Sequence, residues 1–170
     1  MVGRSAGASA APRIRTAAPA DGPAVARIYV ASWNAGFRGL MPPRRCDDDE
    51  IDRWRRDLGE PWPHRWWVAE LERDVAGFAG ICPSRDPVDP TLGELDTIAV
   101  APDCWRRGVG RTLMAQALAF LARDGYREAL LWTLADYPHG HAFYRDTGWQ
   151  PDGGTRSGGL QVRFRHAIDP

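Results

Sequence analysis

The sequence contains no lysine, so all 22 of its basic side chains are arginine. They are matched by 22 aspartates and glutamates, which gives a formal net charge of zero. A nucleic-acid-binding domain usually carries a basic surplus, and a membrane-surface protein usually carries a basic patch. Neither surplus is present, so we expect no nucleic-acid partner and no membrane partner.

Disulfide and membrane-spanning signals are also missing. The three cysteines are an odd number without CxxC spacing, which argues against a disulfide framework and a zinc site. No segment approaches the roughly 18 consecutive apolar residues of a membrane span. Residues 1–12 are rich in glycine, alanine and serine without an apolar core, which predicts a disordered leader. We therefore expect a cytoplasmic protein with one folded domain over residues 13–170.

What is present is an alternation of short apolar strands and amphipathic helices. The expected elements are a strand at Ile14, a helix after Asp21, a helix after the acidic run 47–50, strands over 66–71, 75–82 and 94–100, a helix over 108–123, a strand over 128–134, a helix over 140–147, and terminal strands at 149–150 and 160–166 on either side of a glycine-rich loop. The segment SRDPVDPTLG is expected to be a turn. This order predicts an α/β class (an α+β mixed sheet) in a single domain.

The sharpest local feature is the segment VAPDCWRRGVGRTLM, over residues 100–114, in which a strand leads through a proline turn into a helix. Gly108 and Gly110 let the backbone approach a ligand, and the helix start leaves amides unpaired. Such a helix start binds phosphate well, and nearby arginines add positive charge. Two glycines that simply turn the chain are the competing interpretation. A dinucleotide-binding fingerprint is excluded because its third small residue would stand at Leu113.

Three ordered motifs resemble those of the GCN5-related N-acetyltransferases (GNAT). They are the strand LDTIAV, the loop Trp105-Arg106-Arg107-Gly108-Val109-Gly110, and LWTLADYPHGHAFYRDTGWQPDG over residues 131–153. The resemblance covers roughly residue 13 to the carboxyl end. It implies a mostly antiparallel sheet with one splayed parallel strand pair, about four helices, and acetyl-CoA as acyl donor. The implied cofactor-binding residues are the backbone of Ile98, Ala99 and Val100, and the amides of Arg106, Arg107, Gly108, Val109, Gly110 and Arg111.

Acyl transfer to an amine needs a base for the amine and an acid for the departing thiolate. Glu94 matches the family's general-base glutamate, and Tyr144 matches the tyrosine that serves as the acid. Strict strand alternation would place Glu94 on one face with Asp96, Ile98 and Val100. The competing interpretations are an exposed, solubilising Glu94, with Asp96 as the base in reserve, and a core role for Tyr144.

Several further residues complete the expected site. Tyr137 stands where the family usually has a cofactor-contacting asparagine, and it can donate one hydrogen bond but cannot reproduce an amide. Trp33 and Phe37 are candidate walls of the acceptor groove. His139 and His141 would point apart on a helix, so no metal site is expected. Cys104 has no partner histidine implied by its spacing, so no nucleophilic role is assigned to it.

Together these features predict a transferase that moves an acetyl group from acetyl-CoA to an amine of a small-molecule or peptide acceptor, within a direct ternary complex. The alternative is a non-catalytic acyl-CoA-binding or partner-binding module on the same fold. The acceptor's identity is not fixed by these motifs, and a homodimer, which the resemblance suggests, stays open.

Overall fold

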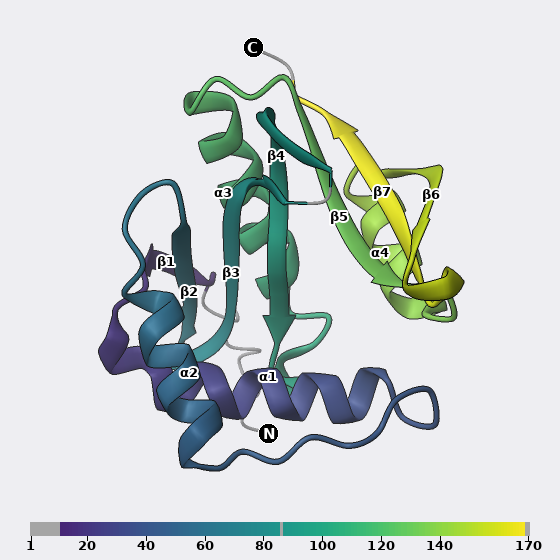
Figure 1. Cartoon of the computed structure of the whole chain (residues 1–170). Coiled ribbons are helices and arrows are strands. Elements are labelled where there is room, and N and C mark those ends of the chain that lie inside the picture. Colours follow the sequence, from purple (N-terminus) through teal and green to yellow (C-terminus); the bar gives the residue numbers. More distant parts are fainter. Residues whose placement is uncertain (1–10, 86, 169–170) are drawn as a thin grey trace, which may run out of the picture.

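All strands belong to one seven-stranded sheet in the computed structural model, which describes residues 11–85 and 87–168 (Figure 1). The strand order is β1-β2-β3-β4-β5-β7-β6, and every neighbouring pair is antiparallel except β4 with β5. The elements are β1 (Arg13–Thr16), α1 (Gly22–Gly36), α2 (Asp48–Leu58), β2 (Arg65–Leu71), β3 (Asp74–Arg85), β4 (Val88–Val100), α3 (Val109–Arg123), β5 (Glu128–Leu134), α4 (Pro138–Asp146), β6 (Gln150–Arg156) and β7 (Gln161–Ala167). The predicted mixed sheet is confirmed. The leader expected over residues 1–12 falls almost entirely outside the described residues.

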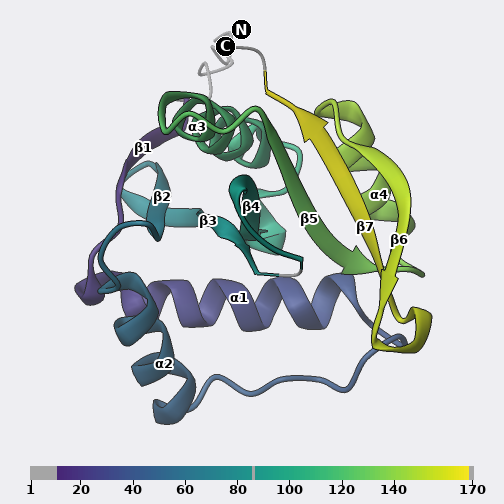
Figure 2. The ribbon, with the colours of Figure 1, turned by 45° about the horizontal axis from the view of Figure 1, so that its top comes forward.

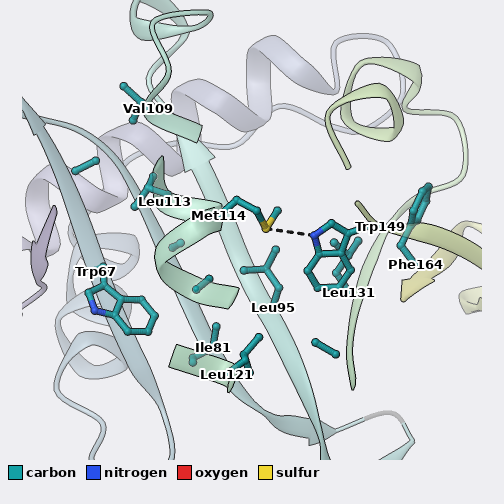
Figure 3. Packing of buried hydrophobic residues seen from close by; sticks show 14 of the residues in the cluster. Trp67, Ile81, Leu95, Val109, Leu113, Met114, Leu121, Leu131, Trp149 and Phe164 are labelled. Carbon is teal, nitrogen blue, oxygen red and sulfur yellow. Dashed lines mark hydrogen bonds between the residues drawn. The ribbon is translucent and has the colours of Figure 1, made fainter. Parts of the chain in front are cut away.

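Two apolar cores lie on opposite faces of the sheet. Helix α3 packs on one face through buried side chains such as Leu113, Met114 and Leu121, while α1 and α2 cover the other through Val25 and Trp54. Figure 3 shows the first core, where the indole N–H of Trp149 donates to the sulfur of Met114 at 3.3 Å. Truncating a fully buried leucine in such a core typically costs about 2 to 5 kcal/mol of stability.

A glycine on β3 allows α3 to approach the sheet closely. A Cβ atom at Gly77 would lie 2.9 Å from the carbonyl oxygen of Ala99 and 3.0 Å from a methyl carbon of Val109. Both separations are closer than van der Waals contact. The first turn of α3 is thereby brought against β3 and β4, next to the end of β4.

Most predicted elements are confirmed, but the hairpin formed by β3 and β4 is longer than the sequence suggested. The segment expected to be a turn contributes to both strands: β3 extends to Arg85, and β4 already begins at Val88. A register shift between Pro83 and Ser84 accommodates the proline, because a bulge tolerates the missing N–H. Strand β6 likewise extends to Arg156, through part of the segment expected to be a glycine-rich loop.

A second irregularity corrects the expected alternation along β4. Gly80 pairs with Thr97 and Ile81 pairs with Leu95, so Asp96 is an extra residue without a partner on β3. A bulge of this kind reverses the faces of the residues beyond it. As a result, Leu95, rather than Glu94, shares the α3 core with Ile98 and Val100.

Candidate functional site

The parallel strands β4 and β5 pair over only two residues each. The pairs are Gly93 with Ala129 and Glu94 with Leu130, and Figure 1 shows the two arrows diverging toward their carboxyl ends. A cavity of about 950 Å³ opens between the diverging parts. It is walled by residues 95–100 of β4, residues 131–134 of β5, and side chains of α1, α3 and α4. Helix α1 crosses from the β1 side toward the carboxyl end of β5, as Figure 2 shows.

The backbone of β4 faces this cavity at alternate residues. The N–H of Ala101 donates to the carbonyl of Ala76 on β3 at 2.8 Å. Because hydrogen-bonded pairs alternate in an antiparallel ladder, the backbone groups of Ala99 also turn to β3, while those of Ile98 and Val100 turn toward β5. The carbonyl of Val100 accepts the indole N–H of Trp105 at 2.8 Å. Of the three residues predicted to bind through their backbone, Ile98 and Val100 are therefore the two whose backbone groups point into the splay.

The loop before α3 has the conformation of an anion-binding helix start. Gly108 is the N-cap at φ +83°, and the backbone of Arg106, two residues earlier, is at φ +61°. The first intrahelical bond runs from the N–H of Thr112 to the carbonyl of Gly108, so the amides before Thr112 lack helical acceptors. Gly110 lies in the first turn, and a Cβ there would come within 3.3 Å of the Phe143 ring.

The arginines around this loop do not all gather at the cavity. Arg106 and Arg111 line it together with Gly108 and Gly110, and we call these four residues the phosphate end. Arg111 also contacts the carboxylate of Asp146 at 3.4 Å.

Arg107 and Val109 were predicted to bind through their backbone amides, and their side chains turn away from the cavity. The side chain of Val109 is 1% exposed and belongs to the α3 core. Arg107 pairs with Glu72 at 3.2 Å, and it is not among the residues that line the cavity. Spacing along the helix start could not anticipate this, because Glu72 lies in the turn between β2 and β3.

Tyr144 lies where the cavity meets α4. Its ring packs beside Phe143 and Phe164, each at 5.7 Å between centroids, and it lines the cavity. Burial raises the pKa of Tyr144 well above its usual range, and the neighbouring Tyr137 adds to this, while a hydrogen bond with Thr133 partly offsets it. The phenol therefore stays protonated at neutral pH, as a proton donor must. Thr133 was not anticipated, since a threonine in an apolar strand carries no distinguishing signal.

The two carboxylates of β4 occupy different environments. The side chain of Glu94 is buried and accepts two hydrogen bonds from Arg85, one from its backbone N–H at 2.9 Å and one from its guanidinium at 2.8 Å. Asp96 contacts the same guanidinium and lines the cavity, whereas Glu94 is not among the described residues that line it. Arg85 was missed in the sequence because it lies within the segment expected to be a turn.

Aromatic side chains of α1, together with Phe37 directly after its end, form a further wall of the cavity. Tyr29, Trp33 and Phe37 line the cavity, with ring centroids 6.0 Å apart for the first two and 4.8 Å for the last two. We call these three residues and Asp96 the acceptor end. Phe37 also meets the Tyr137 ring edge-to-face at 4.7 Å.

The loop after α1 is fixed by side chains of that helix. Trp33 donates its indole N–H to the carbonyl of Pro42 at 3.0 Å. Asn34 both donates to the carbonyl of Arg44 and accepts its N–H, at 3.0 and 2.8 Å. The Arg44 guanidinium lies 4.0 Å from the centre of the Trp33 ring, a cation–π contact. The acceptor wall is thus held by its own loop.

Tyr137 packs between two helices. A Cβ atom at Gly140 would lie 2.2 Å from its ring, and one at Gly36 would lie 2.9 Å from its hydroxyl oxygen. The ring therefore depends on glycine at the carboxyl end of α1 and in the first turn of α4. Tyr137 lines the cavity, and burial raises its pKa above the ordinary range.

His139, His141 and Cys104 make contacts that support the fold. A ring nitrogen of His141 lies 2.9 Å from the carbonyl oxygen of Leu134, and His139 packs beside Trp105. Burial, followed by the charge of Asp103, raises the pKa of the Cys104 thiol, which disfavours the thiolate. Within residues 11–85 and 87–168, no three histidine, cysteine or acidic side chains are grouped to hold a metal ion. Across the same residues, no helix has both the length and the apolar character needed to cross a membrane.

Comparison with known proteins agrees with this arrangement. The model of the acetyltransferase (GNAT) family matches residues 24–149. The "Probable N-acetyltransferase" of Mycobacterium tuberculosis is 27% identical over 150 residues, covering 84% of this chain and 82% of that protein. An aminoglycoside N(6')-acetyltransferase type 1 of Stenotrophomonas maltophilia is 27% identical over 146 residues, covering 84% and 88%. The fold is similar to that of the PaiA N-acetyltransferase from Thermoplasma acidophilum in complex with coenzyme A, with a TM-score of 0.74, 16% identity, and 93% and 99% coverage.

Proposed function

The chain belongs to the acetyltransferase (GNAT) family, and from this premise we propose which of its residues carry out acetyl transfer. The protein is an acetyl-CoA-dependent N-acetyltransferase, so it is an enzyme and not a non-catalytic module on the same fold. Acetyl-CoA supplies the acetyl group as a thioester. The second substrate of the enzyme is an amine, which accepts the acetyl group.

The splay between β4 and β5 is the observation that supports the cofactor site. The outward backbone groups of Ile98 and the N–H of Val100 would hydrogen-bond an extended arm much as a neighbouring strand would, since no strand pairs with them there. The carbonyl of Val100 already accepts the indole N–H of Trp105. The open amides after Gly108 suit a pyrophosphate, with Arg106 and Arg111 supplying positive charge. The residues present therefore fit the donor that the family uses.

Proton transfer is assigned to two side chains that line the cavity. Tyr144 would give its phenolic proton to the departing thiolate, and its raised pKa means that the phenol is protonated at neutral pH. Asp96 would take the proton of the acceptor amine. We prefer Asp96 to Glu94 because Asp96 lines the cavity, whereas both oxygens of Glu94 are held by Arg85.

Acetyl transfer then takes place in one step. The amine nitrogen forms a bond to the acetyl carbonyl carbon, and the carbon–sulfur bond breaks. One proton moves from the amine to Asp96, and one moves from Tyr144 to the sulfur, which leaves as a thiol. Both side chains return to their starting states by exchanging a proton with solvent. Each well-placed acid or base contributes about 100- to 10,000-fold to the rate.

The acceptor end favours an amine on an apolar or aromatic body, whether a small molecule or a peptide. Its wall consists of Tyr29, Trp33 and Phe37, and Asp96 is its charged side chain. Aromatic faces and a carboxylate suit a single ammonium group beside apolar surface. A polycation such as an aminoglycoside, the acceptor that one relative's name gives, would meet only this one carboxylate along the acceptor end.

Two measurements test this function in sequence. Acetyl-CoA at 100 times its dissociation constant stabilises a protein by about 2.7 kcal/mol, which should raise the melting temperature by roughly 5 to 10 °C for this chain length. Thiol release is then followed with aromatic amines, amino acids, polyamines, aminoglycosides and peptides. An unchanged melting temperature would contradict the cofactor site, and release that is fastest with aminoglycosides would contradict the acceptor class. The homodimer expected from the family resemblance stays a prediction, which light scattering can test by measuring the molar mass in solution.

The base assignment is tested by comparing Asp96→Asn with Glu94→Gln. Both changes remove a carboxylate and keep a similar shape. We expect D96N to lower kcat about 100-fold or more while the melting shift with acetyl-CoA stays as in the wild type. A full rate in D96N together with a large loss in E94Q would instead assign the base to Glu94.

A further inference from the structure

Arg85 ends β3 and joins the two carboxylates of β4. The same guanidinium nitrogen contacts an oxygen of Glu94 at 2.8 Å and an oxygen of Asp96. The backbone N–H of Arg85 donates to the other Glu94 oxygen at 2.9 Å. One residue therefore satisfies both oxygens of Glu94 and ties it to the bulge at Asp96.

Without this cation, two negative charges would lie close together in the fold. Glu94 is 3% exposed, and burying a charged group is costly unless an opposite charge pairs with it. Burial alone would lower the pKa of Arg85, but the hydrogen bond with Glu94 and the charge of Asp96 raise it above the ordinary range. Arg85 thus remains charged across the accessible pH range, and its effect on both carboxylates is permanent.

The groups packed around this cluster do not replace the positive charge. From α1, Tyr29 interacts with Asp96, and burial raises the pKa of that phenol. From α2, Asp57 also interacts with Asp96. Burial raises the pKa of Asp57, and the charge of Arg53 lowers it.

The neighbouring side chain on β3 adds no positive charge either. Cys82 pairs with Glu94 across the strands, and burial raises its pKa to about 12. The thiol is therefore neutral at ordinary pH. Arg85 is the cation that the described structure places in contact with both carboxylates.

We propose that Arg85 is a positioning residue whose guanidinium holds Asp96 at the acceptor end beside the buried Glu94, and that this contact thereby sets the pH dependence of acetyl transfer. This inference rests on the role proposed for Asp96. The direction in which the pH profile should move follows from the charges. When Arg85 is removed, a proton remains on the carboxylate pair to higher pH, so the acidic limb of kcat/KM moves upward. A neighbouring arginine typically shifts a carboxyl pKa by about one to three units, and the limb should move by a similar amount.

The experiment compares Arg85→Gln, Arg85→Lys and Arg65→Gln with the wild type across pH. Arg65 is the matched control, because it forms a long-range ion pair with Asp124 at 3.0 Å and does not line the cavity. We expect R85Q to lose activity at neutral pH and recover it at higher pH, R85K to lie between R85Q and the wild type, and R65Q to keep the wild-type profile. The melting shift with acetyl-CoA, measured for each variant, shows that the cofactor site is folded.

The outcomes separate this inference from the proposed function. An acidic limb at the same pH in R85Q and wild type, combined with an inactive D96N, overturns the role of Arg85 alone. A D96N variant with full turnover overturns the role of Asp96 and the inference with it. Activity lost equally at all pH values in R85Q, without recovery in R85K, also overturns the inference, because it indicates a merely structural residue.

Discussion

The two ends of the cavity are built in different ways. The four residues of the phosphate end lie within one short segment, residues 106–111, and their arrangement depends on the backbone conformation at Gly108. The acceptor end combines side chains from α1 and β4, with support from β3. One end carries arginines, and the other carries Asp96. A helix start binds any suitable phosphate, whereas side chains assembled from separate elements can differ from one relative to another. The cofactor is therefore easier to infer than the acceptor.

The largest expected effect lies between the two ends. Replacing Tyr144 with phenylalanine removes the phenolic proton and leaves the ring packed beside Phe164. We expect kcat to fall about 100-fold or more, with acetyl-CoA affinity nearly unchanged. Steady-state kinetics with both substrates measure this. Tyr126→Phe is the matched control, since Tyr126 does not line the cavity. An undiminished kcat in Y144F would remove the acid from the mechanism.

A smaller effect is expected at the phosphate end alone. Gly108→Val places a β-branched residue at φ +83°, which costs about 1 to 3 kcal/mol if the conformation is retained. If binding needs that conformation, acetyl-CoA affinity should fall about tenfold or more, as calorimetry would show. Gly125, at φ +89° beyond the other end of α3, provides the control. G125V should lose stability while keeping the affinity. Equal affinity in both variants would contradict the need for this backbone conformation.

The smallest effect is expected at the acceptor end. Phe37→Leu removes edge-to-face contacts with Trp33 and Tyr137. Such aromatic pairs contribute about 0.5 to 1.5 kcal/mol, so KM for the acceptor should rise about 2- to 10-fold while KM for acetyl-CoA stays constant. Trp62→Leu, at a side chain that is 70% exposed and outside the cavity lining, is the control. A change confined to the KM of acetyl-CoA would mean that the two ends are not separable.

Features encoded by neighbouring residues were predictable from the sequence. Strand β5 matches its expected range, and α3 begins one residue after the predicted start because Gly108 is the cap. The acidic run lies at the start of α2 as predicted, and Asp47 caps this helix by accepting the N–H of Glu50 at 3.0 Å. Each of these depends on chemistry within a few residues.

Features set by distant pairing were not predictable. The bulge at Asp96 depends on how β3 aligns with β4, and it places Leu95 rather than Glu94 on the α3 side. Arg85 reaches the carboxylates only because the hairpin extends beyond its predicted length. Periodicity assumes an uninterrupted strand, so it could name both carboxylates but could not determine which of them lines the cavity.

The divergence of β4 and β5 has a further consequence, because it creates two strand edges in the middle of a sheet. Unpaired edges invite addition of a foreign strand and are normally shortened, charged or covered. Here the covering is aromatic. The indole N–H of Trp105 donates to the carbonyl of Val100, and the Phe37–Tyr137 pair lines the same cavity. The protection against self-association that other proteins build at the outer strands is therefore also needed at the centre of this one, at the place where a ligand must still enter.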